Sequence, residues 1–369
     1  MSAQKLEVAG LFAGCGGLDY GFQQAGFDLA WANELNSDAA SSYMSLTGQK
    51  VVIDDIWNVI DDVPPVDVLV GGPPCQSFSL VGKRLEADPR GNLVFAYQRA
   101  IERVKPMAFV MENVPGLMAS RIDGQRLPLY LAEQFTKMGY EVSILKLLAT
   151  DFFVPQRRQR VLMVGHRSKR RSFTLVTSED FAQIIGEPTL RGVVTVADAL
   201  NDLPIPLPKR SRSGTQYVSS PHSAFSRLMR RDAENQVTLQ TMPTMSALDM
   251  EFVKYIPPGG NYTSIPDAIS TKRIMSFKSS GGRTTTYGRL HPDKPAYTIN
   301  TFFNRPNVGA NYHHIEERLI TVREAMRLQS FPDHFTPSYT SQRSLHMQVG
   351  NAVPPLMARA IAESVRKLF

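Results

Sequence analysis

The chain has 369 residues, of which 43% are hydrophobic and 20% are charged. This composition is ordinary for a globular protein, and the length suffices for one large domain plus a smaller one. No apolar run approaches the ~18 residues that a membrane-spanning helix needs, so we expect no such helix.

Cysteine usage and the N-terminal segment indicate the compartment. Cys15 and Cys75 are the two cysteines of the sequence, too few for a disulfide framework or a zinc cluster. Residues 1–7 lack the apolar centre of a signal peptide, and a thiol that must react favours a reducing environment. We therefore expect a cytoplasmic protein with no metal site.

Positive charge is concentrated in one part of the chain. The net charge is +7, and residues 151–231 contain fourteen Lys and Arg against six Asp and Glu. The rest of the chain is therefore close to neutral. Such a local excess indicates a region that faces a polyanion, although a solvated basic surface would give the same count.

The first half of the chain alternates between strand-like and helix-like segments. A strand over 6–12 runs into a glycine turn at 13–17, and a helical pattern then ends at Gly26. The first five predicted strands end in a glycine turn, a carboxylate or Cys75. We therefore predict a doubly wound α/β fold, with a parallel sheet whose polar residues gather on one edge. Further predicted elements are strands at 27–32, 51–53, 66–70, 108–111, 142–148 and 160–165 and a helix over 92–104.

The amino-acid composition of the chain changes after residue 185. Residues 186–317 are rich in Pro, Ser, Thr, Gly and Arg and carry few helical patterns. We expect a loop-rich domain there rather than disorder, because several aromatic residues supply a modest core. These residues are Phe225, Tyr255, Tyr262, Phe277, Tyr287, Phe302 and Phe303.

Helical order returns towards the C-terminus. Thr321 and Glu324 fit a capping box ahead of an apolar segment, and a last helix is predicted to begin near Pro354. We expect that helix to pack back on the first half of the chain. The predicted catalytic and cofactor-binding domain therefore comprises residues 1–185, completed by 318–369, with a second domain over 186–317.

Cys75 stands directly after a buried strand. The apolar run at 66–70 ends at two glycines, and Pro73 and Pro74 then hold the chain extended. A cysteine presented rigidly at the ligand-binding edge of an α/β sheet is a candidate nucleophile. A small buried apolar residue beside a loop is the alternative interpretation.

The glycine turn at 13–17 predicts a site for a nucleotide-like cofactor. Glycines there allow a ligand to approach the main chain, and Glu34 follows at the spacing of a ribose-binding carboxylate. Asp19 occupies the third glycine position of the dinucleotide fingerprint. This departure weakens the case for NAD and leaves other adenosine cofactors open.

Six motifs occur in order and identify a family resemblance. The chain closely resembles the DNA (cytosine-5)-methyltransferase family, of the bacterial modification-enzyme type, over residues 9–165 and 318–356. The resemblance implies a Rossmann-like domain that uses S-adenosylmethionine and releases S-adenosylhomocysteine, and it makes 186–317 a target-recognition domain. The motifs are LFAGCGG at 11–17, PPCQSFS at 73–79, ENV at 112–114, QRRQR at 156–160, REAMRLQ at 323–329 and QVGNAVP at 348–354.

The resemblance also implies a mechanism. Cys75 would add as a thiolate to carbon 6 of cytosine, which makes carbon 5 nucleophilic towards the methyl group. Glu112 would contact ring nitrogen 3 and the amino group, and Arg158 and Arg160 would hold the cytosine carbonyl and support the site. Because a stacked base cannot reach Cys75, the target cytosine would be flipped out of the duplex.

The family match assigns further residues to the cofactor and to DNA. We take Cys15 as a packing residue rather than a second nucleophile. Cofactor-binding residues implied by the match are Phe12, Gly14, Gly16, Gly17, Glu34, Asp55, Ile56, Pro74, Leu93, Asn351 and Val353. Candidate DNA-binding residues are Gln76, Ser79, Arg157, Arg283, Arg289 and Thr298.

Alternative functions stay open at this point. An RNA (tRNA) cytosine-5 methyltransferase would share the Cys75 and Glu112 motifs, and a catalytically silent DNA-binding regulator would share the fold. A nicotinamide-dependent oxidoreductase would share the fold but not the later motifs. For the preferred function we expect duplex DNA as partner, a monomer, association with the prokaryotic nucleoid when DNA is bound, and a possible cognate restriction endonuclease.

Overall fold

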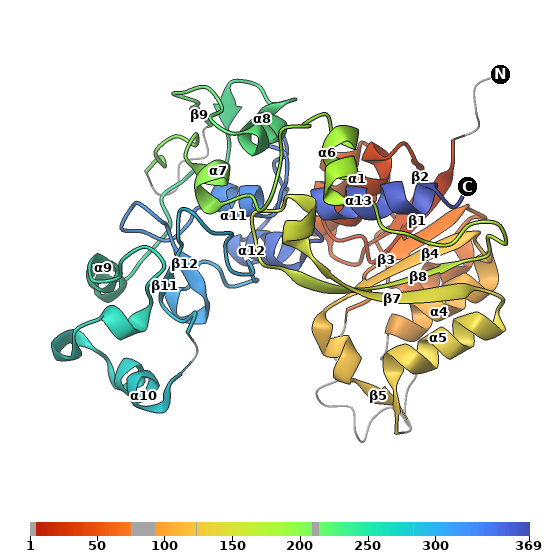
Figure 1. Cartoon of the computed structure of the whole chain (residues 1–369), viewed down its shortest axis with the longest axis horizontal. Helices are drawn as coiled ribbons and strands as arrows, with labels where there is room; N and C mark the ends of the chain where they lie inside the picture. Colours follow the sequence, from red (N-terminus) through yellow and green to blue (C-terminus); the bar gives the residue numbers. More distant parts are fainter. Residues whose placement is uncertain (1–4, 75–92, 123, 209–213, 283) are drawn as a thin grey trace.

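The computed structural model describes residues 5–74, 93–122, 124–208, 214–282 and 284–369. A six-stranded sheet in the order β2-β1-β3-β4-β8-β7 forms one side of the molecule, and the loop-rich region forms the other (Figure 1). The sheet strands are β1 (Glu7–Leu11), β2 (Asp28–Asn33), β3 (Val68–Gly71), β4 (Ala108–Asn113), β7 (Glu141–Leu148) and β8 (Gln159–His166).

The sheet is mostly parallel, which confirms the prediction of a parallel sheet for the first strands, and one later strand is reversed. β1 pairs in parallel with β2 and β3, and β3 with β4, whereas β8 runs antiparallel to both β4 and β7. The connection from Leu148 to Gln159 is too short for the crossover that a parallel pair requires. The predicted strand at 51–53 is reduced to an isolated bridge between Val52 and Asn33.

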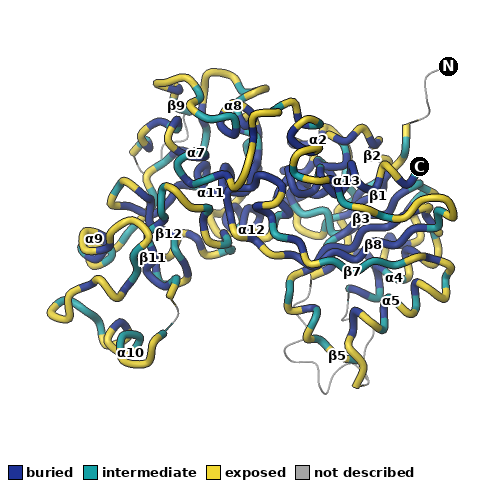
Figure 2. The backbone as a smooth tube through the Cα atoms, viewed as in Figure 1, coloured by how far each residue is buried: buried dark blue, intermediate teal, exposed yellow. Residues whose placement is uncertain are grey.

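Helices cover both faces of the sheet, as expected for a doubly wound fold. Alternate residues of β3 point to opposite faces, so Val68 and Val70 join one hydrophobic cluster while Leu69 joins the other. Helices α1 and α13 cover the first face, and α4 and α5 cover the second (Figure 1). The buried strands between them form the core seen in Figure 2. The helices of this half are α1 (Gly17–Gln24), α2 (Ser37–Thr47), α3 (Ile56–Val59), α4 (Leu93–Val104), α5 (Leu127–Lys137), α6 (Ser178–Ile184), α11 (Val322–Leu328), α12 (Gln342–Asn351) and α13 (Pro355–Arg366).

The C-terminal helix returns to the N-terminal half of the chain. α13 packs against α1, and a Cβ at Gly21 would lie 2.4 Å from the Cβ of Ala358, so only a glycine permits this approach. The predicted capping box is also present: the Thr321 hydroxyl accepts from the Glu324 amide, and the Glu324 carboxylate accepts from the Thr321 amide. Both predictions about the C-terminal segment are therefore confirmed.

The loop-rich region is built from short elements around a small core of its own. Tyr262 and Tyr287 are buried in this core, as predicted, but Tyr255 and Phe302 are 42% and 41% exposed. The prediction that these two rings contribute to the core was wrong, because composition does not specify which face of a short element turns inward. The elements are α7 (Val196–Leu200), β9 (Thr215–Gln216), α8 (Ala224–Arg230), β10 (Gln236–Val237), α9 (Ala247–Lys254), α10 (Lys272–Ser280), β11 (Gly288–Arg289) and β12 (Ala310–Tyr312). No helix of the described residues combines the length and the apolar character that crossing a bilayer requires.

A buried ionic network joins α11 to the loop-rich region. Arg327 is fully buried, and its guanidinium donates to both carboxylate oxygens of Asp333, at 2.6 and 2.5 Å, and to Asp202, at 2.9 Å. The Tyr217 hydroxyl donates to the same Asp333 carboxylate. The charged partners hold the pKa of Asp333 below its usual range against the opposing effect of burial.

We expect Arg327→Met to lower the free energy of unfolding by about 3–5 kcal/mol, since two buried carboxylates would lose their main partner. Chemical denaturation followed by circular dichroism measures this change. Lys137→Met removes a cation from the exposed pair with Glu133 and is the matched control. The control should leave the unfolding midpoint unchanged. If Arg327→Met also unfolds at the midpoint of wild type, the network has no structural role.

Candidate active site

Glu112 lies at the carboxyl end of β4, beside the chain that leads to Cys75. β3 and β4 are neighbours, so the residues that follow Gly71 pass next to Glu112. A Cβ at Gly72 would lie 3.1 Å from Glu112 Oε2, and the Asn113 side-chain amide donates to the Pro73 carbonyl at 2.9 Å. Asn113 therefore holds the main chain just before Cys75, and Glu112 lies beside it.

Asn113 is a positioning residue to which the sequence analysis assigned no role. It belongs to the ENV motif at 112–114, but nothing in the sequence indicates that its amide reaches the Pro73 carbonyl. Cys75, Gln76 and Ser79 lie outside the described residues.

Arg160 completes the charged part of this site. Its Nε lies 2.6 Å from Glu112 Oε1, and both side chains are about nine-tenths buried. The pairing follows from the sheet register, because the antiparallel β8 places Val161 opposite Asn113 and brings Arg160 to the same edge. The structure thus brings together two of the predicted catalytic residues as a buried ion pair.

Arg158 takes a different position. Its guanidinium is buried and donates to the main-chain carbonyls of Ile299 and Gly350, at 2.9 and 2.8 Å. Burial lowers the pKa of Arg158 from its ordinary value, with a further contribution from the charge of Arg160. In the described geometry Arg158 therefore contacts neighbouring main chain, and the predicted contact with a cytosine carbonyl stays a prediction.

The glycine turn after β1 forms a cradle of the kind that a nucleoside cofactor occupies. Phe12, Gly14 and Gly16 adopt positive φ angles of 57°, 58° and 92°, which turns the main chain sharply at the end of the strand. The Gly14 amide donates to the Glu34 carboxylate at 2.8 Å. No described atom lies within 4 Å of the place that a Cβ at Gly14 would take, so space remains beside the turn.

Among the other predicted cofactor residues, Val353 lies against this turn. A Cβ at Gly17 would lie 2.2 Å from the Val353 carbonyl, so the turn contacts the segment after α12 directly. The Asp55 carboxylate caps α3 by accepting from the Trp57 amide at 3.0 Å, and Ile56 is buried beneath it. Pro74, Leu93 and Asn351 also belong to the predicted cofactor set. Pro74 and Asn351 are exposed, and Leu93 is half-buried at the start of α4.

Cys15 is a packing residue, as predicted. The side chain is buried, and its thiol contacts the Gln348 carbonyl at 3.7 Å. Burial raises the pKa of the Cys15 thiol to about 12, which keeps it protonated and unreactive. Among the described residues no group of three or more His, Cys, Asp or Glu is arranged to hold a metal ion.

Asp19 is a buried acid beneath the glycine turn. A Cβ at Gly10 would lie 1.8 Å from Asp19 Oδ1, and the Tyr43 hydroxyl donates to the same oxygen at 3.3 Å. Burial raises the pKa of Asp19 to about 7, which the hydrogen bonds only partly offset. The acid that breaks the dinucleotide fingerprint therefore packs against β1.

This shift predicts a pH-dependent effect of Asp19→Asn. An acid with a raised folded-state pKa reduces stability as the pH rises above its unfolded pKa, near 4, and the loss is complete above the folded pKa, near 7. The stability of the variant relative to wild type should therefore increase between pH 4 and 7 and then stay constant. Urea unfolding at pH 4.5, 6 and 8 measures this difference, and a constant difference would contradict the raised pKa.

The predicted DNA-binding residues have different surroundings. Arg157 is exposed, and the Thr298 hydroxyl donates to the Arg157 carbonyl at 2.8 Å. Arg289 donates to the carbonyls of His313, Ile256 and Ile315, at 3.0, 2.9 and 2.5 Å, so its geometry indicates a structural role. Arg283 lies outside the described residues.

The local excess of positive charge is partly internal. Arg158 and Arg160 are buried, Arg227 and Arg231 pair with Glu187, and Arg230 pairs with Asp202. The number of basic residues in 151–231 therefore overstates the charge that this segment presents to a polyanion.

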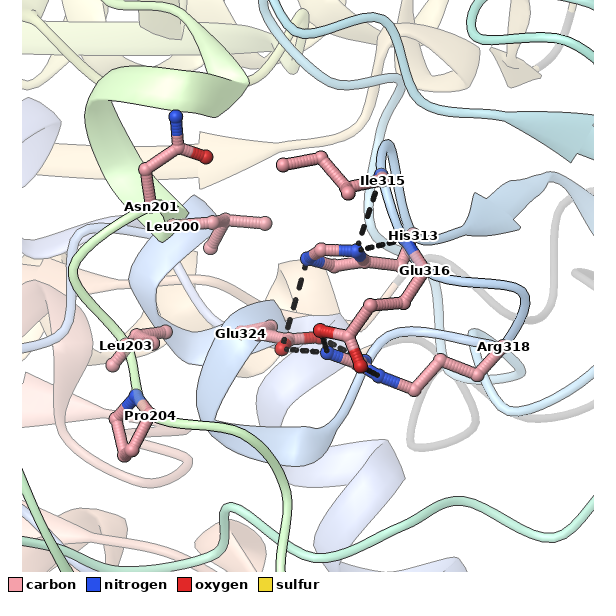
Figure 3. A pocket seen from close by; sticks show the side chains of 9 residues that line it. All are labelled: Leu200, Asn201, Leu203, Pro204, His313, Ile315, Glu316, Arg318 and Glu324. Atoms are coloured by element: carbon pink, nitrogen blue, oxygen red, sulfur yellow. Dashed lines mark hydrogen bonds and ion pairs between the residues drawn. The ribbon is translucent and has the colours of Figure 1, made fainter.

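The lining of a pocket of about 310 Å³ includes none of the predicted catalytic residues that the structure describes (Figure 3). Arg318 contacts the carboxylates of both Glu316 and Glu324, and Ile315 and Glu316 donate their amides to His313 Nδ1. The charged side chains of the pocket are thus paired with one another. The lining residues are Leu200, Asn201, Leu203, Pro204, His313, Ile315, Glu316, Arg318 and Glu324.

Known proteins resemble this chain over its full length. The type II methyltransferase M.DdeI of Desulfomicrobium norvegicum is 30% identical to it, in an alignment that covers 99% of this chain and 89% of that protein. The type II methyltransferase M.NgoFVII of Neisseria gonorrhoeae is 32% identical and covers 100% of this chain and 88% of its own length.

Solved structures share the fold. A candidate DNA modification methyltransferase encoded within a prophage (E. coli) superposes with a TM-score of 0.72 at 25% identity, covering 99% of both chains. The S. pombe Dnmt2 methyltransferase superposes with a TM-score of 0.55 at 15% identity over 99% of this chain and 98% of its own, a likeness of fold alone. The model of the C-5 cytosine-specific DNA methylase family matches residues 6–367. The chain belongs to the C-5 cytosine-specific DNA methylase family.

Proposed function

We propose that this DNA (cytosine-5)-methyltransferase acts on a flipped-out cytosine within a specific duplex DNA sequence, through a covalent adduct of Cys75. One observation carries the proposal: the buried Glu112–Arg160 pair adjoins Gly72 and Pro73, at the start of the segment that bears Cys75. A nucleophile, a carboxyl group and a cation would then converge on one base.

The proposed reaction proceeds in four steps. The Cys75 thiolate adds to carbon 6 of the cytosine and forms a carbon–sulfur bond, while the ring electrons shift to carbon 5. Carbon 5 then forms a bond to the methyl group as the methyl–sulfur bond of the donor breaks. A base removes the proton from carbon 5, and the thiolate leaves carbon 6 to restore the aromatic ring.

Glu112 and Arg160 would lower the barrier to thiolate addition. A protonated Glu112 would donate a hydrogen bond to ring nitrogen 3 and draw electrons away from carbon 6. Arg160, held 2.6 Å from Glu112, would stabilise the negative charge that develops on the ring. A water-excluded pocket strengthens both interactions because little solvent screens them.

The residues around the glycine turn fit S-adenosylmethionine, which supplies the methyl group. Glu34 would accept hydrogen bonds from the ribose hydroxyls, and Asp55 with Ile56 would hold the adenine. Phe12 would pack against the nucleoside, and Gly14 leaves the space that it needs. Gly16, Gly17, Pro74, Leu93, Asn351 and Val353 would complete the site.

DNA would be held by residues from both parts of the chain. Gln76, Ser79, Arg157 and Thr298 are proposed to contact the duplex, with Arg157 and Thr298 exposed or half-exposed beside the site. The Arg289 side chain supports the recognition region instead, since three carbonyls engage its guanidinium. We further propose a monomer that protects its site against a cognate restriction endonuclease in the cytoplasm of a prokaryote.

Incubation with methyl-labelled S-adenosylmethionine tests this function. Unmethylated duplex DNA and tRNA are offered separately, and the products are digested to nucleosides and identified by mass spectrometry. We expect 5-methyldeoxycytidine from the duplex, at a recurring sequence. Label confined to tRNA would favour the RNA alternative, and no label in either would favour a silent DNA-binding regulator.

A further inference from the structure

Three segments far apart in the sequence meet at the Arg158 side chain. One terminal nitrogen of its guanidinium donates to the Ile299 carbonyl at 2.9 Å, and the other donates to the Gly350 carbonyl at 2.8 Å. The side chain is 1% exposed, so water does not replace these bonds. Ile299 belongs to the predicted recognition region, and Gly350 lies in α12.

Gln156 holds the other side of the same Ile299 residue. Its side-chain oxygen accepts from the Ile299 amide at 2.9 Å, and its side-chain nitrogen donates to the Leu328 carbonyl at 2.9 Å. A bridge between Gln156 and Ala296 extends the contact. The main chain of Ile299 is therefore fixed through both its amide and its carbonyl.

Gly350 allows the recognition region to lie directly against α12. A Cβ at Gly350 would lie 2.4 Å from the Thr301 amide nitrogen and 2.5 Å from the Asn300 carbonyl carbon. No side chain fits into this contact. The chain that follows Gly350 leads at once to Asn351 and Val353, which are assigned to the cofactor site.

We propose that Arg158 is a positioning residue that sets the place of Thr298 and Ile299 relative to both the Glu112–Arg160 pair and α12. Arg160 lies two residues after Arg158, and Thr298 lies one residue before Ile299. The contacts of Arg158 with Ile299 and Gly350, here called the junction, would therefore set the distance between the predicted DNA contact and the reacting base. This inference rests on the proposed function. The planar guanidinium donates in two fixed directions at once, which the single ammonium of a lysine does not reproduce.

Arg158→Lys tests the junction while keeping the charge. Steady-state kinetics on duplex DNA should show a KM for DNA raised at least about tenfold, because one hydrogen bond from a charged group is lost at the recognition segment. Sequencing of methylated cytosines should show a larger share of methyl groups outside the wild-type site. Affinity for S-adenosylmethionine should fall less than affinity for DNA, because Gly350 is only next to the predicted cofactor residues whereas Ile299 is next to the predicted DNA contact. Lys146→Ala, on the exposed face of β7, is the control and should match wild type.

Gly350→Ala tests the same junction through the contact of α12 with residues 300–301. Its added methyl group would displace the main chain at 300–301, so the same rise in KM and loss of site preference are expected. The double variant should lose less than the sum of the two single losses, because both changes disturb one contact. Hydrogen exchange followed by mass spectrometry should show faster exchange at 296–303 in each single variant, with exchange in β1 and α1 unchanged.

Two results would overturn the inference. A fall in kcat with unchanged KM for DNA and unchanged site preference would place Arg158 at the base itself. Unchanged exchange at 296–303 in Arg158→Lys would show that the recognition segment does not depend on it. Failure of the wild-type protein to methylate duplex DNA would instead refute the proposed function, and hydrogen exchange would still test the junction.

Discussion

Cys75→Ser is expected to lower methyl transfer by at least about a thousandfold, to the limit of detection in a labelled S-adenosylmethionine assay, because the proposed nucleophile is lost. A serine hydroxyl ionises far less readily than a thiol and supplies almost no anion at neutral pH. The variant should keep the folded structure of wild type and should still bind duplex DNA, which a gel-shift assay measures. Turnover within tenfold of wild type would contradict the assignment of Cys75.

Glu112→Gln should have the second largest effect on turnover. We expect kcat to fall by about 100-fold or more, since the glutamine amide is a far weaker acid than a carboxyl group and draws fewer electrons from the ring through nitrogen 3. The substitution also leaves Arg160 buried without its counter-charge, so the free energy of unfolding should fall by about 1–3 kcal/mol. Single-turnover kinetics at saturating DNA, below the unfolding temperature of the variant, separates the two effects.

Arg160→Lys is the matched control for Glu112→Gln. It keeps a positive charge beside Glu112 but changes the geometry of the ion pair. If Glu112 acts on the base, Arg160→Lys should lose less activity than Glu112→Gln at similar stability. If the two variants lose activity equally, in proportion to their loss of stability, the Glu112–Arg160 pair is structural.

Local sequence patterns predicted the parts of the fold that depend on local rules. The glycine turn at 13–17, the capping box at Thr321 and the helix after Pro354 are all present, because each follows from the conformational preferences of a few residues. The family resemblance alone assigns Glu112 and Arg160 to one site. The structure adds that they lie 2.6 Å apart.

The features that local patterns did not reveal depend on tertiary partners. The direction of β8 was left open by the strand patterns and follows from its short connection to β7. The exposure of Tyr255 and Phe302 is set by the packing of short elements. The position of Arg158 is a further example. Its motif did not reveal the hydrogen bonds to Ile299 and Gly350, more than 140 positions away in the chain, and the implied contact with the base stays a prediction.

Covalent trapping on duplex DNA that carries 5-fluorocytosine is the most direct test of the central claim. Fluorine at carbon 5 is not removed as a proton is, so the adduct should persist after methyl transfer. We predict a stable protein–DNA complex that depends on S-adenosylmethionine, with the modified cytosine attached to Cys75 in the tryptic peptide. A protein that methylates unmodified duplex yet forms no adduct, or forms it at another residue, would contradict the account.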